Sequence, residues 1–171
     1  EVIATKVVSG DKNNKEAQAA TYYWQRLFPA ELQFTRNPEG FPPNNLLNYG
    51  YAILRALVAR SLVGSGLLPT LGIFHRNQYN AYCLADDIME PYRPVVDSVV
   101  CQFLLQDAGD LSLTVERKKE LLQISYQYVF IKKEKASVFN AIQRTTASLS
   151  KCFEGSQRRI LYPTLMPIIK K

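Results

Sequence analysis

One histidine and a few acidic residues are the side chains whose types and spacing could support metal chemistry here. His75, the only histidine, precedes an acidic cluster formed by Asp86, Asp87 and Glu90, and Glu16 lies far upstream. Asp87 and Glu90 are three residues apart, and Asp86 and Glu90 four, so either pair can present two carboxylates on one helix face. Carboxylates with one imidazole suit Mg²⁺ or Mn²⁺ better than zinc. Such ions assist phosphoryl transfer.

Each of these residues also has a purely structural explanation. Glu16 could be a carboxylate favoured at a helix start, Asp86 and Asp87 a solvated face, and His75 a hydrogen-bonded loop residue. The spacing alone leaves both interpretations open. A serine or cysteine triad is disfavoured, because the chain has one histidine and no GxSxG motif.

Helices must position these side chains, since most of the chain has helical periodicity and turn residues punctuate it. Helices are predicted over 14–28, over 45–63 with Asn44 as the N-cap, over 77–106, over about 114–125 and over 136–153. Pro91 and Pro94 predict a kink or break in the third helix, and His75 lies on the connection before it. The β-rich residues 126–131 predict a small strand or hairpin. The fold class is therefore mainly α with at most one small hairpin, in a single domain over 1–171. Residues 1–13 form a leading segment and 156–171 an extended basic tail.

Composition excludes several classes of protein. With 171 residues, 47% hydrophobic and 21% charged, the chain is globular, and it has no apolar run long enough to span a membrane. Three scattered cysteines form no CxxC pair, which indicates a reducing cytosol. The absence of an initiator methionine and of a signal peptide predicts a fragment of a longer cytoplasmic protein.

Charge is distributed unevenly along the chain. The net charge is +2 over residues 1–60, −4 over 61–110 and +8 over 111–171. An acidic middle that contains the histidine, followed by a basic last third, is compatible with a metal site beside an anion-binding surface. Charge alone favours the simpler explanation of solvated helix faces.

Three sequence blocks, in this order, resemble the CRISPR-associated spacer integrases: SGDKNNKEAQAATYYWQRLF, PPNNLLNYGYAILRALV and LGIFHRNQYNAYCLADDIMEPYRPVVD. The motif DDIMEPYRP is most similar to the corresponding motif of the type II members. The resemblance is strong over residues 9–97 and looser beyond them. It implies the helical catalytic domain of the family, without the β-rich domain that precedes it there.

The resemblance also implies a site and a reaction. The family's metal ligands fall on Glu16, His75 and Glu90, with Asp87 assisting and Asp86 given no role. The implied cofactor is Mg²⁺ or Mn²⁺. The implied reaction joins the 3′-hydroxyl end of a short DNA fragment to CRISPR repeat DNA, and endonuclease activity results when water replaces that hydroxyl. The implied partners are DNA, a second copy in a homodimer and the small second Cas subunit, in a prokaryotic cytoplasm and with no membrane. Two alternatives remain, a non-catalytic DNA-binding or assembly module and the related transposon integrase.

Basic and aromatic residues near these motifs are candidates for DNA contacts. The basic candidates are Arg36, Arg76, Arg93, Lys132, Lys133, Arg158 and Arg159. Arg93 could equally form an ion pair with Glu90 three residues earlier. Tyr22, Tyr23 and Trp24 could stack on bases, but an aromatic stripe at helical spacing is more often part of a core.

Overall fold

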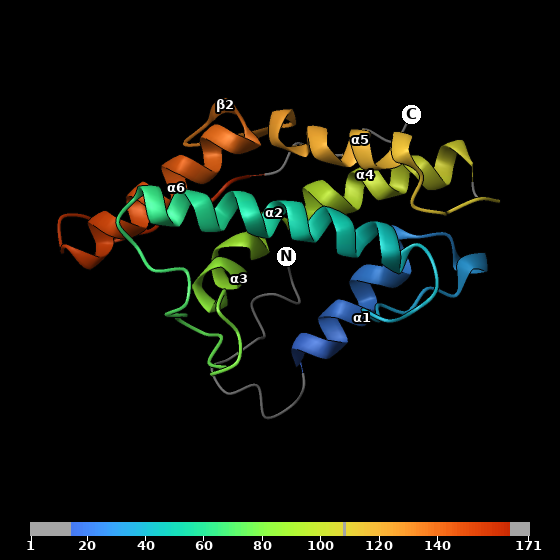
Figure 1. Ribbon diagram of the computed structural model, residues 1–171, viewed down its shortest axis with the longest axis horizontal. Helices are drawn as coiled ribbons and strands as arrows, with labels where there is room; N and C mark the ends of the chain where they lie inside the picture. The colour runs from blue at the N-terminus through green and yellow to red at the C-terminus, as the bar shows by residue number, and fades with distance from the viewer. Residues whose placement is uncertain (1–14, 108, 165–171) are drawn as a thin grey trace.

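The long helix α2 (Asn44–Gly64) is the element around which the other helices pack. The computed structural model describes residues 15–107 and 109–164, and within them α2 contacts α3, α4, α5 and α6. Figure 1 shows α2 crossing the middle of the molecule, with α5 and α6 along one side and α1 and α3 along the other. The helices are α1 (Lys15–Leu27), α2, α3 (Cys83–Met89), α4 (Arg93–Gln106), α5 (Val115–Leu122) and α6 (Val138–Phe153). The prediction of a mainly α fold is confirmed.

The inner face of α2 is apolar and closely packed. Leu46, Leu54, Val58 and Leu62 recur at helical spacing and are fully buried. Gly50 lies on the same face, and a Cβ there would overlap the Val96 side chain. The glycine therefore allows α4 to approach α2 closely.

The predicted break in the third helix is confirmed. α3 ends at Met89, a 3₁₀ turn covers Glu90–Tyr92, and α4 begins at Arg93. Pro91 and Pro94 both lack an N–H and so cannot donate to the helical ladder. As a consequence, Glu90 lies in the 3₁₀ turn and is not on one regular α-helix with the two aspartates.

Two predicted helix starts are wrong. The third helix begins at Cys83 and not near residue 77, because Asn77 and Asn80 accept hydrogen bonds from the backbone N–H groups of Tyr79 and Tyr82, both at 2.9 Å. Such local side-chain contacts compete with helix formation. Asn44 is the first residue of α2 and not its N-cap, which is Pro43.

The last third of the described chain contains the predicted small hairpin. β1 (Tyr128–Ile131) pairs antiparallel with β2 (Glu134–Ser137), and Phe130 also pairs with Thr164 from the chain beyond α6. α5 is followed by a 3₁₀ turn over Gln123–Tyr126. The leading segment 1–13 and residues 165–171 of the predicted tail lie outside the described residues. None of the described helices is long and apolar enough to cross a membrane.

The hairpin turn holds two lysines in an unfavourable backbone conformation. Lys132 and Lys133 have φ values of 51° and 67°, the left-handed region that a two-residue hairpin turn requires and that Asn-Gly adopts most readily. We expect the double substitution Lys132→Asn/Lys133→Gly to raise the free energy of unfolding by about 1 kcal/mol, measured by urea denaturation. The control Lys132→Ala/Lys133→Ala removes the same charges but leaves residues with a Cβ in the left-handed conformation, so the free energy of unfolding should not rise. An equal gain from both variants would assign the effect to charge.

Candidate metal and DNA site

His75 is held by Asp87. His75 lies on the loop between α2 and α3, and its Nδ1 is 2.6 Å from Asp87 Oδ1. The loop backbone converges on the same carboxylate. Ile73 and Phe74 donate N–H groups to Oδ2 at 2.5 and 2.9 Å, and His75 donates its own N–H to Oδ1 at 3.1 Å. One side chain of α3 therefore fixes both the histidine ring and the loop that presents it.

These contacts also keep the Asp87 carboxylate ionised, because together they lower its pKa. Burial by itself raises the pKa of Asp87, but the hydrogen bonds from Phe74, the His75 ring, and the His75 and Ile73 backbone lower the pKa below its ordinary value. An ionised carboxylate only accepts hydrogen bonds, so Nδ1 of His75 carries the hydrogen. In the neutral ring, Nε2 then has the free lone pair. Since the histidine side chain is 49% exposed, Nε2 remains available to a ligand.

A glycine lets the loop fold this tightly. A Cβ on Gly72 would overlap the carbonyl oxygen of His75 and would lie 2.8 Å from Cys83 Cβ and 3.2 Å from Asp87 Oδ2. Gly72 was not among the residues predicted to belong to the site. Its position three residues before the only histidine is the signal that could have marked it.

Of the other two predicted ligands, the structure describes the side chain of Glu90 but not that of Glu16. Glu90 forms an ion pair with Arg93, Oε1 to Nη2 at 2.9 Å, which confirms the pairing considered for Arg93. Residue 16 lies in the first turn of α1, and the side chain of Glu16 lies outside what the structure describes. Among the described side chains, no three His, Cys, Asp or Glu residues form a metal-binding group. The convergence of Glu16, His75 and Glu90 therefore stays a prediction.

The solvated-face explanation is wrong for both aspartates. Asp87 is buried against the loop, and the Asp86 side chain is only 6% exposed. Arg55 binds Asp86 with two nitrogens, at 2.7 and 3.0 Å, and Asn80 donates a third hydrogen bond at 2.7 Å. Asp86 thus joins α2 to the start of α3, a structural contact that sequence spacing did not reveal.

A buried carboxylate that sequence analysis missed lies on α4. Asp97 accepts hydrogen bonds from Tyr23 of α1 at 2.6 Å and from Tyr51 of α2 at 2.5 Å. Burial raises its pKa to about 6, although the two hydroxyl groups and the positive charges of Arg93 and Arg36 lower it. The available signal was an aspartate within the apolar run VVDSVV.

Two arginines lie above the same tyrosine. The guanidinium of Arg93 is 4.8 Å, and that of Arg36 5.4 Å, from the centre of the Tyr51 ring. Arg36 also donates to Asn44 at 2.9 Å and to Asn48 at 2.8 Å. Arg93 Nε is buried and has no hydrogen-bond partner among the residues that the structure describes.

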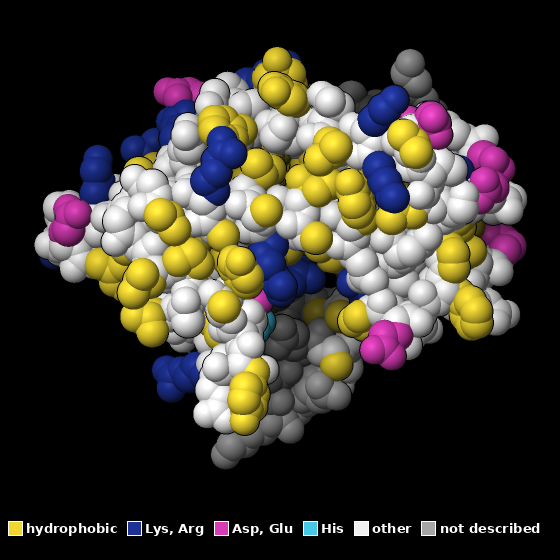
Figure 2. All heavy atoms as spheres, viewed as in Figure 1, with side chains coloured by type: hydrophobic (Ala, Val, Ile, Leu, Met, Phe, Trp, Pro, Cys, Tyr) yellow, Lys and Arg dark blue, Asp and Glu magenta, His cyan; other side chains and the backbone are white. Residues whose placement is uncertain are grey.

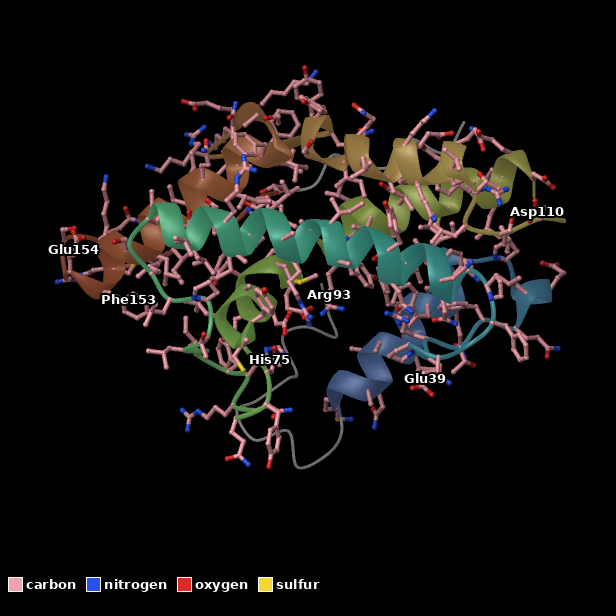
Figure 3. All side chains as sticks on the ribbon, in the orientation of Figure 1. Glu39, His75, Arg93, Asp110, Phe153 and Glu154 are labelled. Carbon is pink, nitrogen blue, oxygen red and sulfur yellow. The ribbon has the colours of Figure 1, made fainter. Side chains whose placement is uncertain are left out.

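Arg93 and the histidine face a common region. In Figure 2, Lys and Arg side chains gather in a hollow below α2, with the histidine at its edge. In Figure 3, His75 and Arg93 point into the space below α2.

The remaining DNA-contact candidates lie on the surface. Arg76 is exposed directly after His75, and Lys132 and Lys133 form the hairpin tip. Arg158 and Arg159 are exposed in the segment after α6. On α1, Trp24 packs on Phe28 and Phe34, at ring-centre distances of 5.9 and 5.3 Å, whereas Tyr22 is 46% exposed. Trp24 is therefore partly buried against the core, as the core interpretation of the stripe predicted, whereas that interpretation is wrong for Tyr22, and Tyr23 is 37% exposed.

Comparison with known proteins decides the family. The profile of the CRISPR associated protein Cas1 family matches residues 13–122, which include all the predicted ligands. The chain belongs to the Cas1 family. The CRISPR-associated endonuclease Cas1 of Neisseria meningitidis serogroup C is 38% identical over 167 residues, which cover 97% of this chain and 54% of that protein. A Cas1 endonuclease of Pyrobaculum aerophilum is 42% identical over 88 residues, or 51% of this chain and 30% of the relative.

This Cas1 chain thus spans about half the length, or less, of these curated relatives. A solved structure, a casposase bound to an integration product, has a similar fold, with a TM-score of 0.71 and 22% sequence identity. That similarity covers 86% of this chain and 48% of the casposase chain. It shows that this Cas1 fold is shared with a casposase.

Proposed function

We propose that this Cas1 chain is the catalytic part of a metal-dependent DNA integrase and endonuclease. It joins the 3′-hydroxyl ends of short DNA fragments to CRISPR repeat DNA. The observation that carries the proposal is the hydrogen bond from His75 Nδ1 to Asp87. Metal-binding histidines commonly donate their second ring N–H to a carboxylate, which orients the ring and makes the ligating nitrogen more basic. The relatives' naming as Cas1 endonucleases supports the same reaction class.

The donor set fits Mg²⁺ or Mn²⁺. His75 would supply Nε2, and Glu16 and Glu90 would supply carboxylate oxygens, which these ions prefer. When bound, such an ion neutralises phosphate charge and stabilises the departing oxygen of a phosphodiester. Asp87 does not bind the ion in this arrangement, because its two oxygens already accept four hydrogen bonds from residues 73–75.

Arg93 and Arg36 would bind DNA phosphate near the reacting bond. A guanidinium binds phosphate through several N–H groups in a fixed plane, and one buried N–H of Arg93 has no partner within the described part of the chain. Arg76, the hairpin lysines and the pair Arg158–Arg159 would hold the DNA backbone on either side by charge. Because the chain covers about half the length of its relatives, we propose the homodimer and the association with the small second Cas subunit for the full-length protein only.

The Asp87–His75 pair provides the test. We expect Asp87→Asn to lower Mn²⁺-dependent strand transfer by the full-length protein about 10- to 100-fold, since outer partners of metal-binding histidines have effects of that size. The substrate is a short duplex with 3′-hydroxyl ends, and the target is repeat-containing plasmid DNA. The matched control Asp110→Asn changes an exposed aspartate distant in sequence from the site and should retain full activity.

Wild-type transfer by Asp87→Asn would remove the support for a metal-binding His75. Transfer that needs no divalent ion would refute the metal-dependent mechanism. DNA binding without any transfer would instead favour the non-catalytic module. Insertion into DNA that lacks a repeat would favour the transposon-type reaction.

A further inference from the structure

Asp97 connects three helices at one point. Its Oδ2 accepts the hydrogen bond of Tyr23 on α1, its Oδ1 accepts that of Tyr51 on α2, and its own backbone belongs to α4. We infer that Asp97 is a positioning residue, which fixes the rotation of α1 through Tyr23 and so directs residue 16 toward the site of His75 and Glu90. The inference rests on the proposed function, in which Glu16 is a metal ligand.

The helical repeat connects Tyr23 to residue 16. The two positions are seven residues apart, which is close to two turns, so they share one face of α1 and are separated by about 10 Å along its axis. A rotation of α1 that moved Tyr23 away from Asp97 would therefore turn residue 16 by the same angle. The hydrogen bond opposes that rotation.

Apolar contacts also hold α1 in place, but they define its rotation less strictly than the hydrogen bond between Tyr23 and Asp97 does. Trp24 and Phe28 pack on each other and on Phe34, and Cys101 Sγ is 3.6 Å from the carbonyl oxygen of Leu27. These contacts lie in the second half of α1, where Tyr23 also lies, or directly after the helix. A hydrogen bond is directional, whereas packed rings can slide over each other. The hydrogen bond of Tyr23 therefore constrains the rotation of α1 more tightly than the aromatic contacts do.

A carboxylate suits this position better than a neutral acceptor. It offers one oxygen to each hydroxyl group at the same time, and hydrogen bonds to a charged acceptor are the stronger kind. The charge is buried, and Arg93 and Arg36 lie close enough to favour it. Burial and the proximity of Asp97 also keep both tyrosines protonated, because both effects raise their pKa values.

A matched pair of substitutions tests the inference. Tyr23→Phe and Tyr51→Phe each delete one hydroxyl group and one hydrogen bond to the same carboxylate, but only Tyr23 belongs to α1. Mn²⁺ binding to the chain is measured by the paramagnetic resonance signal of the free ion. We expect Tyr23→Phe to weaken Mn²⁺ binding about tenfold, and Tyr51→Phe to change it less than about twofold. Tyr22→Phe, on the exposed neighbour, should have no effect.

A second readout requires no metal. Trp24 is the only tryptophan of the chain and follows Tyr23 directly. Its fluorescence should become more accessible to acrylamide in Tyr23→Phe than in Tyr51→Phe, with circular dichroism confirming that both variants fold. Asp97→Asn keeps one carbonyl oxygen and should give an intermediate increase. Equal acrylamide quenching and equal Mn²⁺ affinity in the two tyrosine variants would overturn the inference.

Glu16→Gln distinguishes a failure of the positioning role of Asp97 from a failure of the proposed function. If it abolishes Mn²⁺ binding while Tyr23→Phe leaves binding unchanged, the positioning role of Asp97 is refuted and the proposed function stands. If Glu16→Gln binds Mn²⁺ as the wild type does, the ligand role of Glu16 is refuted, and the inference with it.

Discussion

Replacement of His75 by alanine is expected to lower Mn²⁺-dependent strand transfer by the full-length protein about 10³-fold. The proposed ion contributes several kcal/mol to the transition state, and each 1.4 kcal/mol corresponds to a tenfold change in rate. His75 is half exposed on its loop, so its removal costs little packing. Single-turnover transfer assays at saturating DNA measure the effect. Glu90→Ala should cause a loss of similar size.

The double variant should be about as inactive as either single variant, because both changes remove the same ion and effects within one catalytic unit are not additive. Asp86→Ala is the control. It breaks the contact with Arg55 and Asn80, so we expect a lower melting temperature with transfer retained below that temperature. Near-wild-type transfer by His75→Ala would exclude histidine ligation and favour a site of carboxylates alone.

Gly72→Ala should reduce strand transfer about 10²-fold without adding any polar or charged group. The new methyl group would overlap the His75 carbonyl oxygen and crowd Asp87, so the loop must move away from α3. A displacement of about 1 Å in a catalytic group can cost this much in rate. The measurement is transfer rate beside the melting temperature, which should fall by only a few degrees.

Gly64→Ala is the matched glycine control, because a Cβ at that position meets no atom within 4 Å. It should leave transfer and folding unchanged, or stabilise α2 slightly. If Gly72→Ala transfers DNA at the wild-type rate, the tight loop is not needed to place His75.

The sequence predicts the elements of this fold better than it predicts their contacts. Apolar periodicity locates α1, α2 and α6, and the prolines at 91 and 94 locate the break between α3 and α4, because both signals are local. The start of α3 is misplaced because asparagine side chains form turns that compete with the helix. Local signals of that kind are weaker than periodicity and easily overlooked.

The parts of the site that sequence analysis missed depend on residues distant in the chain. Asp97 accepts two hydrogen bonds only because α1 and α2 bring Tyr23 and Tyr51 to it in the fold. Asp86 is not a solvated residue because Arg55, 31 residues earlier, folds onto it. By contrast, the resemblance to the family already implies that Asp87 assists, and in the structure Asp87 contacts the His75 ring.

The ion pair between Glu90 and Arg93 has a consequence for the order in which ligands bind. In this pair the carboxylate proposed for the cation and the guanidinium proposed for the phosphate are bound to each other. A cation that takes the carboxylate releases the guanidinium, and a phosphate that takes the guanidinium releases the carboxylate. Each binding event therefore removes part of the free-energy cost of the other, and by thermodynamic linkage the benefit is equal in both directions. Under the proposed function, ion and DNA would then bind cooperatively, and the site would discriminate against either one arriving alone.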